Sequence, residues 1–177
     1  HLKRAAAVVT GNHKKAQDAT SLYYLGICFL KQGKIEQALD MLYRCTWAYE
    51  WTSAGYTLVA QIEASRKNWE RALDAADRAC KANTQNVEAL TAKAVILRQV
   101  GVYEKAARTA EYALSVDPLC FIAMNELRLL SDKVDVDSDV AGKKELLHHL
   151  RNEPYNFIET ATRYSEMGLF KEAAELM

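Results

Sequence analysis

Two clusters in the sequence carry side chains that bind metals or move protons: the adjacent His148 and His149, and an acidic run of Asp132, Asp135, Asp137 and Asp139. Histidine titrates near neutral pH and is a common metal ligand. Adjacent residues on a helix, however, point about 100° apart, which suits a shared metal poorly. We interpret the pair as surface or groove-edge histidines. The acidic run lacks the glycine and closing glutamate of a calcium loop, so we interpret it as a solvated connector and predict no metal site.

Four cysteines form the next group of potentially reactive side chains: Cys28, Cys45, Cys80 and Cys120. The chain has no C-x-x-C pair and no histidine at ligand spacing from them, which argues against a zinc site. Three fall on apolar helical faces, where a thiol behaves as a small hydrophobic group. We interpret them as reduced core cysteines, with a disulfide pairing left open by the sequence. Reduced thiols favour a cytoplasmic location.

A run of five aromatic residues is dense enough to bind a sugar or a peptide ring: Tyr43, Trp47, Tyr49, Trp51 and Tyr56. Aromatic faces can form a stacking platform for such a ligand. The alternative is that the rings wedge consecutive structural units together, and this is the interpretation we favour.

No further pattern in the chain predicts catalysis. The sequence contains no Gly-rich phosphate loop, nucleophile elbow or paired-carboxylate signature. Lys plus Arg equals Asp plus Glu at 23 each, so no overall field favours nucleic acid or an anionic membrane. Apolar stretches are interrupted well short of the roughly 20 residues that span a bilayer. We predict a non-enzymatic protein without cofactor, nucleic-acid partner or membrane partner.

A period of 34 residues organises the elements that carry these side chains. It links Ala38, Ala72 and Ala106, and such a period is typical of stacked helical repeats. Within each unit, apolar residues recur at three- and four-residue steps, break at a turn and resume, which predicts a helix pair. Glycines at 33, 101 and 168 are placed to end first helices in the left-handed conformation. In the second unit Lys67-Asn68 replaces glycine, and asparagine is expected to take that conformation.

The predicted organisation is a remnant helix over 1–18, repeats over about 19–52, 53–86 and 87–120, an irregular repeat over 121–153 and a truncated one over 154–177. This gives about eleven helices and no strand. Helix starts are predicted at the caps Thr20 or Ser21, at Asp117-Pro118 and at Glu153-Pro154. Both ends cut through a repeat, as expected of an excerpt of a longer protein. The apolar end face of the last unit, Phe157, Phe170, Ala173 and Met177, therefore predicts possible self-association.

These units resemble the tetratricopeptide repeat (TPR) family. The first unit shows Leu22-x-x-Leu25-Gly26-x-x-Phe29, followed by the small or apolar residues Ala38, Leu42 and Cys45. The resemblance implies an all-α, right-handed α-solenoid of antiparallel helix pairs. A second resemblance, carried by Leu150–Asn156 and the following Ala161, Tyr164 and Gly168, is to repeat arms of large bacterial proteins that also contain a mutarotase-like domain.

In the TPR family, partner peptides lie in a concave groove lined by the first helices. The matching residues here are Tyr23, Tyr24, Ile27, Thr57, Leu58, Gln61, Thr91, Val95 and Arg98. One subfamily grips acidic chaperone tails with Lys, Asn and Arg, but the matching positions here hold Tyr23, Ile27, Leu58, Glu88 and Ala92, so this clamp is not expected. The resemblance implies a scaffold that binds a protein segment or a neighbouring domain of its own chain. The alternative is a repeat arm whose carbohydrate-active or sugar-binding domain lies outside these residues.

Overall fold

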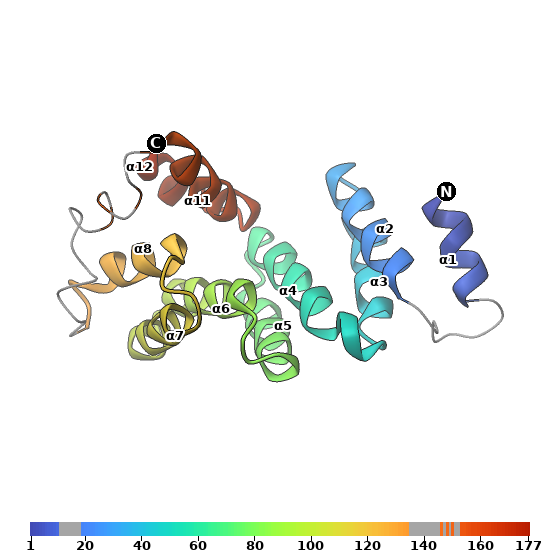
Figure 1. The fold of residues 1–177 in the computed structure, drawn as a ribbon, viewed down its shortest axis with the longest axis horizontal. Helices are drawn as coiled ribbons and strands as arrows, with labels where there is room; N and C mark the ends of the chain where they lie inside the picture. The colour runs from blue at the N-terminus through green and yellow to red at the C-terminus, as the bar shows by residue number, and fades with distance from the viewer. Residues whose placement is uncertain (11–18, 135–145, 147, 149, 151–152) are drawn as a thin grey trace.

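The computed structural model describes residues 1–10, 19–134, 146, 148, 150 and 153–177, and this part of the chain contains ten helices and no strand (Figure 1). The helices are α1 (Leu2–Thr10), α2 (Thr20–Lys31), α3 (Ile35–Cys45), α4 (Tyr49–Ser65), α5 (Trp69–Ala82), α6 (Val87–Gln99), α7 (Tyr103–Val116), α8 (Phe121–Leu130), α11 (Pro154–Glu166) and α12 (Phe170–Leu176). The predicted acidic connector lies outside the described residues apart from Asp132.

Successive helices pack as antiparallel pairs because small residues let their axes approach closely. The periodic alanines Ala38, Ala72 and Ala106 are all fully buried. Two glycines show how tight the crossings are: a Cβ on Gly26 would lie 2.9 Å from the Leu42 side chain, and one on Gly55 would lie 2.8 Å from the Cys45 sulfur. Larger side chains would force such helices apart. The α2–α3, α4–α5 and α6–α7 pairs then stack along the chain (Figure 1).

The turns inside the pairs follow the same period. Gly33, Gly101 and Gly168 have positive φ angles of 71°, 81° and 69°, which confirms the predicted left-handed turns. In the second unit the prediction was wrong by one residue, because Lys67 takes the positive φ of 61° and Asn68 does not. Position 67 is the periodic equivalent of the glycines. The Asn68 side chain instead donates a hydrogen bond to Glu63, at 2.7 Å.

The predicted helix starts are confirmed in part. Pro154 is the first residue of α11, as expected for a residue without a backbone N–H. Helix α2 begins at Thr20, but Ala19 occupies the cap position and no side chain caps the helix. Helix α8 begins only at Phe121, because the Asp117 carboxylate accepts the Leu119 N–H at 3.0 Å and forms a turn before the helix.

The last helix pair departs from simple stacking. Helices α2, α4, α6 and α8 are the first helices of their units, and α11 is the first helix of the last described unit. Helix α11 contacts α8, and it also contacts α4, which belongs to a unit far earlier in the chain (Figure 1). In an ideal solenoid each repeat touches only its neighbours. The inner face is therefore partly covered by the chain itself.

Candidate partner-binding groove

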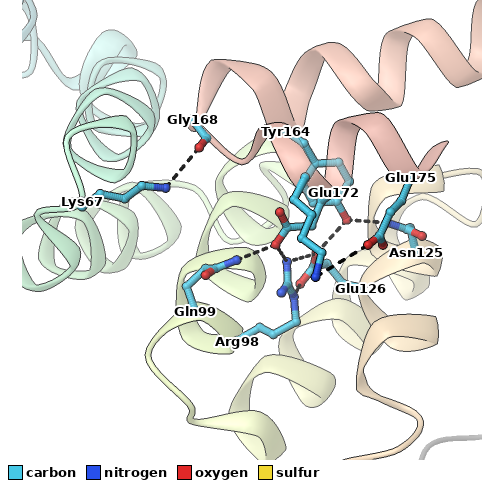
Figure 2. A network of polar contacts seen from close by, with 10 residues as sticks. Lys67, Arg98, Gln99, Asn125, Glu126, Tyr164, Gly168, Glu172 and Glu175 are labelled. Atoms are coloured by element: carbon cyan, nitrogen blue, oxygen red, sulfur yellow. Dashed lines mark hydrogen bonds and ion pairs between the residues drawn. The ribbon is translucent and has the colours of Figure 1, made fainter. Parts of the chain in front are cut away.

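A buried polar network fixes α11 and α12 against α6 and α8 (Figure 2). The guanidinium of Arg98 donates to both oxygens of Glu126, at 2.7 Å from Nε and 3.2 Å from Nη2. The Tyr164 hydroxyl donates to Glu126 at 2.7 Å and accepts from Asn125 at 2.8 Å. Glu126 and Tyr164 are both 0% exposed. Arg98 also reaches Glu172 of α12, at 3.2 Å.

The environment fixes the protonation state of these groups. Burial, together with the charge and hydrogen bond of Glu126, raises the pKa of Tyr164 well above its usual value, so the hydroxyl stays a donor. Burial alone would raise the pKa of Glu172. Hydrogen bonds from its own backbone N–H, Arg98 and Gln99, with the Arg98 charge, outweigh this and lower that pKa below its ordinary value. The network therefore holds Glu172 ionised against Arg98.

Contacts nearer the surface tie the same helix pair to the first two units. Lys31 at the end of α2 pairs with Glu166 at 3.3 Å. Lys67 donates to the carbonyl oxygen of Gly168 at 3.1 Å. A Cβ on Gly168 would lie only 3.1 Å from the Cα atom of Ser65, so the turn between α11 and α12 sits directly on the end of α4.

A pocket of about 380 Å³ remains between α11 and the inner face. Leu58 and Gln61 of α4 form one wall, and Tyr155 and Ile158 of α11 form the opposite wall. Glu88 at the start of α6 also lines the pocket, and it pairs with Arg163 of α11, another lining residue. A volume of this size is at the lower end of the range that holds small ligands, about 300 to 1,000 Å³. It can accommodate one or two large side chains.

Beside the pocket, an aromatic cluster covers the junction of α2 and α4. The Tyr23 ring stacks on Trp51 with centroids 4.5 Å apart, and Tyr24 meets Trp51 edge-on at 5.9 Å. Burial raises the pKa of Tyr23, and the charge of Glu88 raises it further. Tyr24 remains 47% exposed. This cluster is the open, apolar end of the inner face.

The predicted aromatic run is divided between two places. Trp51 belongs to the inner cluster, whereas Tyr43 meets Tyr56 at 6.4 Å in a separate contact. Both Trp51 and Tyr56 pack against the core, which agrees with the interpretation that these rings wedge consecutive units together. Trp47 and Tyr49 are 51% and 85% exposed, so the wedge interpretation was wrong for these two residues. Trp47 lies in the turn between α3 and α4, and Tyr49 is the first residue of α4.

The nine groove residues predicted from sequence fall into three groups. Tyr23, Tyr24, Ile27 and Leu58 keep partial exposure on the inner face. Thr57, Thr91 and Val95 are buried, so they support the face rather than present it. Gln61 and Arg98 are largely covered, Gln61 beside the pocket and Arg98 in the network under α12.

The sequence also singled out histidines, acidic residues and cysteines as candidate reactive groups. His148 is exposed, and His149 lies outside the described residues. Among the residues that the structure describes, no group of three or more His, Cys, Asp or Glu could hold a metal ion. All four cysteines are free, and burial raises the pKa of the Cys45 thiol to about 12. No helix in the described ranges is long and apolar enough to cross a bilayer.

Sequence reasoning missed most of the network. Only Arg98 was among the predicted groove residues, and the others are Asn125, Glu126, Tyr164 and Glu172. The available signal was Asn125-Glu126 after the apolar run that begins α8, because a charge within an apolar segment requires a partner when it is buried. The identity of that partner could not be read from the local pattern.

No protein-family profile and no curated protein sequence matches the chain. Solved structures do match. The first TPR of Spaghetti (RPAP3), bound to the HSP90 peptide SRMEEVD, is 26% identical with a TM-score of 0.61 and spans 66% of this chain and 92% of that one. MamA from Desulfovibrio magneticus RS-1, residues 41 to the end, is 18% identical with a TM-score of 0.65 and spans 91% and 92%. A further MamA structure is 14% identical, with a TM-score of 0.65, over 89% and 87%. The chain therefore has a TPR-like fold of stacked helix pairs over the part that the structure describes.

Proposed function

We propose that the chain is a non-catalytic interaction scaffold whose inner face binds a segment of a partner protein or a neighbouring domain of its own chain. The observation that carries this proposal is the open apolar end of that face, where Tyr24 is 47% exposed in the cluster with Trp51. Leu58, on the same helix as Trp51, lines the pocket together with Ile158. Tyrosine and tryptophan are enriched among the few residues that dominate the binding energy of protein interfaces. The TPR of Spaghetti, which shares the fold, was solved with a peptide bound.

The chemistry of the face favours an apolar partner segment over an acidic chaperone tail. None of the five clamp-equivalent residues is a cation: Tyr23, Ile27, Leu58, Glu88 and Ala92. We therefore expect selectivity for apolar or aromatic anchors, and no measurable preference for a peptide such as SRMEEVD.

Peptide selection on the intact chain tests the proposal. Peptides would be selected from a random display library, and their affinities measured by fluorescence polarisation for wild type, Tyr24→Ala and Tyr112→Ala. Tyr24 and Tyr112 are 47% and 46% exposed, so the two variants lose equally exposed rings. Tyr112 lies on α7, a second helix, and serves as the matched control.

We expect Tyr24→Ala to weaken binding about tenfold or more, the loss typical of an aromatic anchor, and Tyr112→Ala to change it little. Selected peptides that bind Tyr24→Ala as tightly as wild type would refute the assignment of this face. The second expectation from the sequence, a repeat arm for a carbohydrate-active domain, stays a prediction.

A further inference from the structure

The inner face already holds one α-helix. Helix α11 lies against α4 and α8, and its polar contacts extend to α2 and α6. Glu166 pairs with Lys31, which is 135 residues earlier in the chain, and Arg163 pairs with Glu88, which is 75 residues earlier. Such contacts do not arise from stacking of neighbouring repeats. These contacts join α11 to units that do not neighbour it in the chain.

Helix α11 has the pattern of a helix bound in a groove. Thr160, Ala161 and Tyr164, together with the C-cap residue Met167, are buried at three- and four-residue steps. The opposite face, with Thr162 among others, is exposed. Amphipathic helices that dock into grooves are recognised through anchors with this spacing. The inner face therefore selects for helical side chains, in addition to the peptide contacts at its open end.

The face is also specific in its polar requirements. Glu126 and Asn125 are buried and meet the Tyr164 hydroxyl, while Glu88 meets the Arg163 guanidinium. A docked helix without the hydroxyl would leave the buried Asn125 amide without this acceptor, and an unpaired buried polar group is costly. A suitable helix must therefore carry an arginine followed by a tyrosine, with an apolar residue one turn further on.

We propose that the inner face of α2, α4, α6 and α8 is a helix-binding surface with α11 as its resident ligand. A partner presents an amphipathic helix with the same Arg-Tyr-x-x-apolar pattern and takes the place of α11. This inference rests on the proposed function, because it names the partner class and the control of the same face. Docking of α11 then limits access, since an attached helix competes at an effective concentration in the millimolar range.

Exchange with the chain's own helix tests the inference without an identified partner. The probe is a fluorescein-labelled synthetic peptide of residues 154–177, added to the full chain. The release variant Arg163→Glu/Glu166→Lys places like charges against Glu88 and Lys31, and hydrogen exchange of α11 measures its undocking. The control Lys171→Glu/Glu175→Lys makes the same changes of charge in the same helix pair, on residues that pair with each other.

We expect faster hydrogen exchange in α11 and at least tenfold tighter peptide binding in the release variant than in wild type or the control. A peptide with Tyr164→Phe should bind the release variant about tenfold more weakly than the unchanged peptide does. A charge swap gives a second test: in a chain with Lys31→Glu and Arg163→Glu, a peptide with Glu166→Lys should bind more tightly than the unchanged peptide, because its lysine can pair with the new glutamate. The single variant Glu166→Lys, at an exposed ion pair, gives the same test if the double variant loses helicity.

The inference is overturned if the peptide fails to bind a chain whose α11 is released, or if it binds wild type and release variant equally. Because the probe is the chain's own helix, this failure would leave the peptide-binding proposal at Tyr24 intact. Conversely, loss of the Tyr24 effect with intact helix exchange would reject the open-end site alone.

Discussion

Removing the cation from the buried network should expose the cost of burying Glu126. The Glu126 side chain is fully inaccessible, and both of its oxygens accept hydrogen bonds from Arg98. In Arg98→Met the Glu126 carboxylate keeps its hydrogen bond from the Tyr164 hydroxyl but loses the positive charge of Arg98. Breaking a buried ion pair from one side costs about 3–5 kcal/mol. We expect the free energy of unfolding to fall by that amount.

The double variant Arg98→Met/Glu126→Gln separates buried charge from lost packing. The amide oxygen introduced at position 126 still accepts a hydrogen bond from the Tyr164 hydroxyl, and no buried carboxylate remains at that position. Glu172 keeps its 2.8 Å hydrogen bond from Gln99. We expect a loss of only about 1–2 kcal/mol, the scale of ordinary hydrogen-bond losses, so the second substitution should restore about 2 kcal/mol.

Urea denaturation followed by circular dichroism at 222 nm gives these values if the slopes of the transitions agree. Arg78→Met is the matched control, because Arg78 pairs with Asp74 at 2.9 Å on the exposed side of α5 and should shift the midpoint little. The reasoning is refuted if Arg98→Met loses less than about 1 kcal/mol, or if the double variant is no more stable than Arg98→Met.

Glu172, the cysteines and Ala72 can be tested by single substitutions or by chemical labelling. The pKa of Glu172 is lower in the folded than in the unfolded state. Its ionised form therefore stabilises the fold above the unfolded pKa, and this stabilisation is lost as the pH falls through the folded pKa. Glu172→Gln should be less stable than wild type at pH 7, and the difference in unfolding free energy should disappear as the pH is lowered in urea denaturation series. With Ellman's reagent on the folded chain, exposed Cys28 should react first and Cys45, whose thiol pKa is raised to about 12 by burial, only after unfolding; early labelling of Cys45 would contradict its burial. Ala72→Leu should overpack the α4–α5 crossing and cost about 1–3 kcal/mol by thermal melting, with Leu at exposed Lys81 as the control.

Local features of the fold could be predicted because each one is encoded within a single repeat. The alanine period locates the helix crossings, and the glycines at 33, 101 and 168 locate the turns. The error at Lys67 is instructive. Side-chain preference pointed to Asn68, but the repeat geometry fixes which position needs the positive φ. At that position the period predicted the backbone better than residue type did.

The candidate site could be predicted only where it depends on one repeat. Tyr23, Tyr24 and Leu58 were assigned to the inner face from their place in the repeat, and the structure keeps them partly exposed there. The assignment of Val95 to the accessible groove surface did not anticipate its complete burial. Accessibility depends on what covers a helix, and a repeat pattern carries no information on a covering element from another unit.

The sequence by itself determined the helix pairs, their stacking order and the lack of recognisable catalytic motifs. Only the tertiary structure decided that α11 returns over the inner face and that Arg98, Glu126 and Tyr164 meet. The physical reason is one of range. Helix formation and pair packing depend on residues a few to 34 positions apart, whereas the return of α11 depends on the summed rotation of several units, which no local spacing records.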